Sequence, residues 1–144
     1  MNIKFIALDF GGVLAYKKDR KYHMKDDAIV GLNYIKGLNI PCTIWTNNTK
    51  DFIGYLYWLG ILDYFNPSLI CNSYTLPPGN DKPAVGFYTS AINLLKMSYS
   101  DVLFVDDTKE NIEVASKLGI NSILYESPLK DTIIKGLSRA RRNK

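Results

Sequence analysis

The sequence has little that would cross-link it covalently or anchor it in a membrane. It contains only two cysteines, Cys42 and Cys71, and each lies in an apolar, strand-like run. We expect buried free thiols there, because a disulfide requires an oxidising compartment that nothing else in the sequence indicates. The longest apolar stretches are only as long as a β-strand, so neither a transmembrane helix nor a membrane partner is expected.

Targeting segments, repeats and linkers are also missing. Residues 1–4 lead directly into an apolar run without the layout of a signal peptide, and we therefore expect a cytoplasmic protein. No repeat, low-complexity tract or linker divides the 144 residues, a length typical of one domain with one core. We predict a single domain over residues 1–144.

The sequence has only a small excess of positive over negative charge. The formal net charge is +4, and part of it lies in a basic C-terminal tail at residues 139–144. Such a tail is either a solvated helix end or a contact for nucleic acid or another anionic partner. The net charge by itself does not identify a nucleic-acid-binding protein.

What the sequence does contain is a regular alternation of strand-like and helix-like segments. The apolar runs predict strands at residues 3–8, 41–45, 69–71, 102–105 and 122–125. Helical patterns cover residues 26–36, 50–58, 84–96, 109–118 and 129–139. Repeated βα units predict a doubly wound, Rossmann-like α/β fold of three layers, in which helices cover both faces of a parallel sheet.

Two segments interrupt this alternation. Residues 15–25 are polar and rich in Lys and Tyr, and we expect a flap or short hairpin over a site. Residues 74–82 contain a Pro-Pro-Gly-Asn run that predicts a loop. We also expect an aromatic cluster to pack in the core or at its edge rather than to stack on bases: Tyr55, Tyr57, Trp58, Tyr64 and Phe65.

A carboxylate followed by glycines stands at the end of the first strand-like run. Asp9 follows residues 3–8 and precedes Phe10, Gly11 and Gly12. Open α/β sheets bind ligands at the carboxyl ends of their strands, and glycines let the backbone turn sharply and approach a ligand closely. The pattern predicts an active site at Asp9, where Gly11 has no side chain to act as an acid.

Two further polar motifs follow along the chain. Thr46 and Asn47 end the second run and offer a hydroxyl and an amide to phosphate oxygens. Lys82 precedes Pro83, which suits the first turn of a helix and leaves Lys82 at the positive end of that helix. A cation there would stabilise both Asp9 as a nucleophile and the charge of a transferred phosphoryl group.

A pair of carboxylates completes the set. Asp106 and Asp107 end the run at residues 102–105, and together with Asp9 they would repel one another unless a cation compensates. Mg²⁺ suits a site with few carboxylates and some waters. Singly, each motif has a plain structural role, such as capping the helix that follows Thr108. Because all four motifs occupy strand ends or helix starts, we interpret them together as a phosphoryl-transfer site.

In these motifs and their order, the chain resembles the haloacid dehalogenase-like (HAD) superfamily of phosphohydrolases. The matching stretches are residues 8–14, 44–47, 81–83, 87–88, 102–107 and 110–120. The resemblance implies a Mg²⁺-dependent phosphatase in which Asp9 forms an aspartyl-phosphate and Lys82 neutralises charge. The implied substrate-binding residues are Phe10, Gly11, Thr46 and Asn47. The implied metal ligands are Asp9, the Gly11 carbonyl, Asp106 and Asp107.

Gly11 departs from the family pattern. Most phosphatases of the superfamily have a second Asp at this position, which protonates the leaving alkoxide and later activates water. General acid–base help of this kind contributes about 10²–10⁴-fold, so we expect slow hydrolysis of alkyl phosphates. Asp19 and His23, in the polar segment, are candidate substitute acids.

The spacing of the motifs leaves no room for the cap domain that the family often inserts. Family analogy links such open sites to large substrates, such as phosphorylated ends of proteins or nucleic acids, or to homo-oligomers in which a neighbour covers the site. The alternative function is a catalytically weak or inactive HAD-like module for binding or assembly. A dehalogenase fits less well, because its chemistry needs no metal, and a receiver domain has its motifs in the opposite order.

Overall fold

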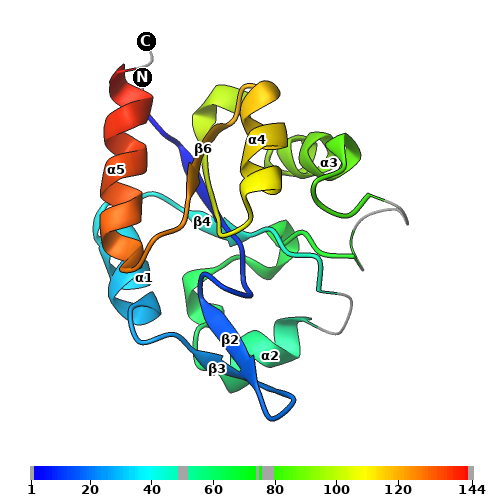
Figure 1. The fold of residues 1–144 in the computed structure, drawn as a ribbon, viewed down its shortest axis with the longest axis vertical. Coiled ribbons are helices and arrows are strands. Elements are labelled where there is room, and N and C mark those ends of the chain that lie inside the picture. Colours follow the sequence, from blue (N-terminus) through cyan, green and yellow to red (C-terminus); the bar gives the residue numbers. More distant parts are fainter. Residues whose placement is uncertain (1, 49–51, 74, 76–79, 143–144) are drawn as a thin grey trace.

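A parallel sheet forms the centre of the protein in the computed structural model, which describes residues 2–48, 52–73, 75 and 80–142 (Figure 1). Its strands are β1 (Phe5–Leu8), β4 (Cys42–Ile44), β5 (Val102–Asp106) and β6 (Asn121–Leu124). Their order is β4-β1-β5-β6, and Leu8 pairs with both Ile44 and Val105. The carboxyl ends of β4, β1 and β5 therefore meet at one edge.

Helices cover both faces of this sheet. They are α1 (Ala28–Gly37), α2 (Phe52–Trp58), α3 (Val85–Leu95), α4 (Lys109–Lys117) and α5 (Leu129–Arg142). Short 3₁₀ turns are η1 (Leu62–Tyr64), η2 (Pro67–Leu69) and η3 (Tyr99–Asp101). Side chains alternate along β1, so Ile6 and Leu8 join the core under α1 and α5, while Phe5 and Ala7 join the core under α3 and α4. The predicted doubly wound, three-layer fold is confirmed.

The pattern of small and apolar residues sets how the helices dock. In α5, Leu129, Ile133 and Leu137 recur at helical spacing and are buried. A Cβ at Gly136 would lie 2.8 Å from a methyl group of Leu103, so glycine lets α5 approach the sheet closely. After the C-cap Leu118 of α4, Gly119 has a left-handed backbone with φ +99°, which glycine adopts without strain.

The polar segment at residues 15–25 forms an antiparallel hairpin, β2 (Ala15–Lys18) with β3 (Lys21–Met24). The two turn residues, Asp19 and Arg20, have φ values of 53° and 64°, which is the left-handed backbone of a type I′ turn. This hairpin and α1 are the only helices and strands between β1 and β4. No cap domain is inserted there.

The predicted strand at residues 69–71 was wrong. The chain forms η2 instead, and Cys71 makes one isolated parallel bridge to Trp45. Asn66 caps this turn by accepting a hydrogen bond from the Ser68 N–H at 3.0 Å, with Pro67 at its start. Asn66 and Pro67 favour a turn, and the three apolar residues that follow are too few to define a strand.

The predicted packing of the aromatic cluster was wrong for two of its members. Tyr57 and Trp58 are 76% and 84% exposed, because they lie on the side of α2 opposite its buried residues Phe52 and Leu56. Tyr55 and Tyr64 are half-buried and Phe65 is buried, as expected.

Several predicted boundaries also shift. Helix α3 begins at Val85 with Ala84 as its N-cap, so Pro83 precedes the helix rather than opening it. Helix α5 continues through Arg142 and contains most of the predicted tail, whereas residues 143–144 lie outside the described residues. The same holds for residues 50 and 51 of the predicted second helix and for residues 74 and 76–79 of the predicted loop.

Both cysteines are free and buried, as predicted, and burial raises the pKa of each thiol to about 12. Within the described residues, every helix is too short or too polar to cross a lipid bilayer.

Candidate active site

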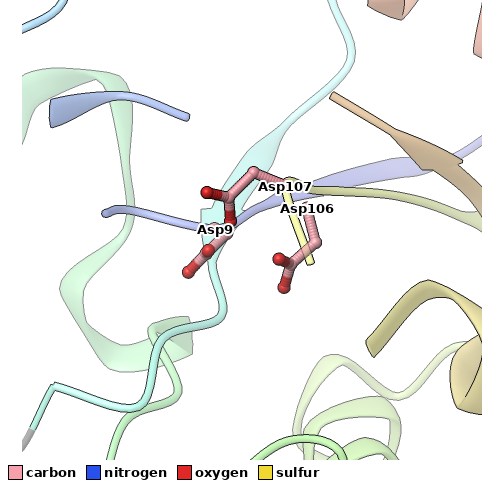
Figure 2. Close-up of side chains that lie close together, drawn as sticks. All are labelled: Asp9, Asp106 and Asp107. Atoms are coloured by element: carbon pink, nitrogen blue, oxygen red, sulfur yellow. The ribbon is translucent and has the colours of Figure 1, made fainter. Parts of the chain in front are cut away.

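The polar motifs meet at the carboxyl edge of the sheet. Asp9 follows β1, Thr46 lies just after β4, and Asp106 is the last residue of β5. Oxygen atoms of Asp9, Asp106 and Asp107 lie within 4.8 Å of one another (Figure 2). The structure therefore brings together the strand-end carboxylates that the sequence places far apart. We call these three residues the acidic centre.

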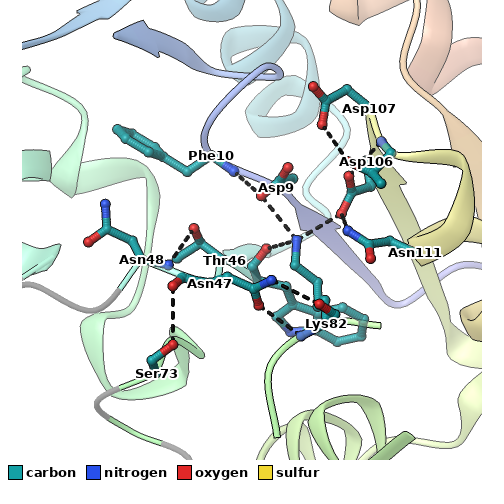
Figure 3. Close-up of polar contacts among 12 residues, drawn as sticks. Asp9, Phe10, Thr46, Asn47, Asn48, Ser73, Lys82, Asp106, Asp107 and Asn111 are labelled. Atoms are coloured by element: carbon teal, nitrogen blue, oxygen red, sulfur yellow. Dashed lines mark hydrogen bonds and ion pairs between the residues drawn. The ribbon is translucent and has the colours of Figure 1, made fainter. Parts of the chain in front are cut away.

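The Lys82 ammonium group is the cation of the acidic centre (Figure 3). Its Nζ donates hydrogen bonds to Asp9 Oδ1 at 3.0 Å, to Asp106 Oδ2 at 2.7 Å and to the Trp45 carbonyl at 2.7 Å. An ammonium group has three N–H donors, and all three are used. Lys82 is only 6% exposed, so these partners are what make its burial tolerable.

The Asn47 side chain fixes the backbone of Lys82. Its Oδ1 accepts from the Lys82 N–H at 2.8 Å, and its Nδ2 donates to the Lys82 carbonyl at 3.0 Å. Both ends of the amide are thus engaged with the peptide groups of one residue. Asn47 positions the cation, and its role as a substrate ligand stays a prediction.

Asp9 presents one engaged and one free oxygen. Oδ1 accepts from the Phe10 N–H at 2.8 Å and from Lys82, while no donor among the described residues contacts Oδ2. Burial raises the pKa of Asp9 to about 7; Lys82 opposes this shift, and Asp106 adds to it. A further cation would be needed to keep the Asp9 carboxyl fully ionised near neutral pH.

Asp106 is fully buried, and both of its carboxylate oxygens accept hydrogen bonds. Oδ2 accepts from Lys82 and from Asn111 Nδ2 at 3.0 Å, and Oδ1 accepts from the Thr108 N–H at 2.9 Å. Asn111 was not predicted as a site residue. The signal was present: Asn111 lies four residues before the buried Ala115, so it is a polar residue on the apolar face of α4.

Asp107 is exposed and packs against the glycine turn. A Cβ at Gly12, where φ is +86°, would overlap the Asp107 carboxylate. By contrast, nothing lies within 4 Å of a Cβ built at Gly11. The structure therefore requires glycine at position 12, but position 11 has room for a side chain.

The residues present fit a hard divalent cation. Three carboxylates face one ammonium group, and all the available donors are oxygens, which Mg²⁺ prefers. Asp9 Oδ2 has no donor among the described residues, and the exposed Asp107 accepts a hydrogen bond only on Oδ1, from the Thr108 hydroxyl at 3.4 Å, so both can serve as ligands. The Gly11 carbonyl accepts no hydrogen bond from the described residues. Asp106, which is already bonded to Lys82 and Asn111, is less available.

Thr46 and Phe10 border the centre in different ways. Thr46 is buried, and its Oγ1 accepts from the Asn48 N–H at 3.2 Å, which leaves its hydroxyl proton free for a ligand. The Phe10 ring is fully buried, 4.6 Å from the Phe52 ring, and its N–H is held by Asp9. A direct role of Phe10 in substrate binding stays a prediction.

Neither candidate substitute acid contacts the acidic centre in the described part of the chain. Along β3, His23 faces away from the site and stacks on Tyr16 with ring centroids 5.4 Å apart, while Asp19 lies in the exposed turn. The neighbouring Tyr22 faces inward, and its phenol oxygen accepts from Asn48 Nδ2 at 3.1 Å. Tyr22 is therefore the hairpin hydroxyl that borders the site.

The fold and the site together define a class: a Rossmann-like hydrolase domain with a strand-end Asp, a bridging Lys and a second acidic pair. A family model described as "Haloacid dehalogenase-like hydrolase" matches residues 10–125. Since this match covers more than half of the chain, the protein belongs to the haloacid dehalogenase-like hydrolase family. No curated protein matched the chain significantly.

Solved structures support the same fold. An uncharacterized protein from Listeria monocytogenes serotype 4b is 24% identical with a TM-score of 0.75, over 87% of this chain and 79% of that one. A HAD-superfamily hydrolase from Geobacter sulfurreducens is 15% identical with a TM-score of 0.71, over 89% and 92% of the two chains. The L-2-haloacid dehalogenase from Xanthobacter autotrophicus is 12% identical with a TM-score of 0.72, over 95% and 83%.

Proposed function

We propose that the protein is a Mg²⁺-dependent phosphohydrolase that acts through an aspartyl-phosphate on Asp9. The observation that carries this proposal is the buried Lys82 ammonium group, 3.0 Å from Asp9 and 2.7 Å from Asp106, beside the exposed Asp107. A site of this kind stabilises negative charge that develops on a transferred phosphoryl group.

In the first step, the carboxylate of Asp9 forms a bond to phosphorus through one of its oxygens while the bond between phosphorus and the leaving oxygen breaks. In the second, water attacks phosphorus, and the bond to Asp9 breaks to return the carboxylate and free phosphate. The Thr46 hydroxyl donates to a phosphoryl oxygen, and Lys82 stabilises the charge on Asp9 and on the phosphoryl group. Bound Mg²⁺, held by Asp9, Asp107 and the Gly11 carbonyl, would neutralise charge on the phosphoryl oxygens.

The departing oxygen must obtain its proton without a side chain at position 11. Because no cap is inserted between β1 and β4, we infer that solvent supplies this proton. Leaving groups that are stable as anions, such as phenolates, need little help of this kind. We therefore propose a preference for aryl over alkyl phosphates.

Gly11 also favours the second candidate, a HAD-like module that binds a phosphoryl group without efficient turnover. Such a module would bind beryllofluoride with Mg²⁺, a mimic of the phosphorylated aspartate, yet hydrolyse aryl phosphates no faster than an Asp9→Asn variant. The intact set of Asp9, Lys82 and Asp107 supports the enzyme over this alternative.

The test is hydrolysis of an aryl phosphate with Mg²⁺ and with a chelator. Asp9→Asn removes the nucleophile while keeping an oxygen that accepts from Lys82, and it should lower kcat by about 10⁴-fold or more. Asp63→Asn, at an exposed carboxylate in η1, is the matched control and should leave kcat unchanged. Metal-independent hydrolysis, or hydrolysis that survives in Asp9→Asn, would refute the assignment.

A further inference from the structure

The hairpin is one of two segments with a marked excess of positive charge, the other being the basic tail at residues 139–144. Residues 15–25 contain five basic residues and one acidic residue, a net charge of +4 that equals the net charge of the whole chain. Removing them from the totals of eighteen and fourteen leaves thirteen basic and thirteen acidic residues elsewhere. The rest of the chain has no net charge in total, although the basic tail within it contains four basic residues and no acidic one.

Strand alternation places two pairs of residues on the face of the hairpin that is turned away from the core. Tyr16 lies opposite His23, and Lys18 lies opposite Lys21; we call these four residues the outer face. All four are exposed, and the Tyr16 and His23 rings stack with an interplanar angle of 24°. The outer face thus carries a stacked pair of exposed aromatic rings followed along the strands by two exposed lysines.

The two lysines of the outer face have no anionic partner within the described residues. The ion pairs found there involve other cations, so Lys18 and Lys21 face each other as like charges. Like charges directly opposite each other in a sheet are destabilising, and an anion between them would relieve this repulsion. The outer face is therefore complementary to a negatively charged partner.

The opposite face of the hairpin and the residue that follows β3 contact the chain next to Asp9. The Tyr22 ring packs 4.9 Å from the Phe10 ring, and Lys25 Nζ donates to the Gly12 carbonyl at 3.1 Å. From Gly12 to Tyr16 the chain spans at most about 14 Å. A partner on the outer face would therefore lie beside the acidic centre.

We propose that the outer face binds single-stranded nucleic acid. Backbone phosphates pair with Lys18 and Lys21, and an unpaired base stacks on the Tyr16 ring. A duplex hides its base faces, while an acidic peptide or an anionic lipid surface would use the charges and leave the rings unused. That the terminal phosphate of such a strand enters the site at Asp9 rests on the proposed function, whereas binding to the outer face does not.

The experiment is fluorescence anisotropy of a labelled oligothymidylate without a terminal phosphate, titrated with the full chain in chelator at several salt concentrations. Tyr16→Ala should weaken binding by about five- to 150-fold, the range found for loss of one stacked base, and Tyr16→Phe should preserve it. The double variant Lys18→Gln/Lys21→Gln should reduce the slope of log K against log salt by about 1.4.

A matched control removes the same charge at the end of α5. Arg141→Gln/Arg142→Gln should change affinity less than about twofold. Three results would each overturn the proposal. The first is equal weakening by this control, and the second is no binding of the oligonucleotide. The third is tighter binding of a duplex or of heparin, with an affinity that Tyr16→Ala does not change. The binding experiment involves no turnover, so its result is independent of the proposed function. If the protein binds the oligonucleotide but hydrolyses no aryl phosphate, only the proposed function is rejected. If it hydrolyses aryl phosphate but does not bind the oligonucleotide, only this inference is rejected.

Discussion

The acidic centre and the outer face of the hairpin lie close together but differ in whether their charged groups have partners within the protein. In the centre, Asp106 and Lys82 are buried, and their charged atoms have protein partners. On the outer face, Lys18 and Lys21 are exposed and bonded to no carboxylate in the described residues. A charge that the fold itself satisfies is fixed in position for chemistry, whereas a charge left in solvent is available to a partner.

The largest expected effect comes from breaking the buried network. Lys82→Met leaves Asp9 and Asp106 without their shared cation, and removing one partner from a buried ion pair costs about 3–5 kcal/mol. We expect a loss of this size in the free energy of unfolding, measured with urea at neutral pH. Lys4→Met removes an exposed ion pair to Asp101 at 3.8 Å and should cost less than about 1 kcal/mol. Equal losses would contradict the contrast between buried and exposed charge.

The two glycines of the turn should respond differently to a methyl group. Gly12→Ala would displace the Asp107 carboxylate and strain a left-handed backbone, and a misplacement of about 1 Å at a reacting centre costs about 10²-fold in rate. Gly11→Ala adds its methyl group to open space and should change aryl phosphate hydrolysis little. Steady-state kinetics would compare the rates of aryl phosphate hydrolysis by the two variants, with folding checked by circular dichroism.

The room at position 11 also allows a gain of function. Gly11→Asp would supply the missing general acid, so hydrolysis of an alkyl phosphate should rise by about 10²-fold, the low end for such catalysis. Hydrolysis of an aryl phosphate should rise less, because phenolate leaves without a proton. Gly11→Asn, of similar size but without an acid, is the control. An equal gain with Asn would show that the proton is not the cause.

A further effect concerns how the stability of the metal-free protein depends on pH. The pKa of Asp9 is about 7 in the fold against an ordinary 3.8, so the unfolded chain loses this proton first as pH rises. Between about pH 4 and 7 this residue therefore makes the fold less stable with rising pH. Asp9→Asn should be more stable than wild type at pH 8, with a difference that vanishes toward pH 4 in urea unfolding. A constant difference would rule out this titration.

Much of this arrangement can be predicted from local sequence patterns. The apolar runs before Asp9 and Asp106 are long enough to define strands, and parallel strands bring their carboxyl ends to one edge. The three apolar residues at 69–71 are too few, and Asn66 and Pro67 start the turn η2, which takes in Leu69 and leaves Cys71 with an isolated bridge. The existence of the acidic centre follows from periodicity, whereas short elements depend on neighbouring turn residues.

The finer roles depend on contacts that no local pattern encodes. Asn47 reaches the backbone of Lys82 across 35 residues, and the difference between Gly11 and Gly12 lies in backbone angle and in the nearness of Asp107. The direction of His23 follows from strand alternation, but only once the register of the hairpin is known. The sequence therefore predicts which residues belong to the site, whereas their individual contacts depend on the packing of the fold.

The most direct test of the central claim is to trap the phosphoryl group. The protein is mixed with an aryl phosphate and Mg²⁺, quenched in acid during turnover, and its peptides are examined by mass spectrometry. We predict a phosphate adduct on the peptide that contains Asp9, absent in the Asp9→Asn variant and absent when a chelator replaces Mg²⁺. Turnover that proceeds with the adduct on another residue would contradict the account.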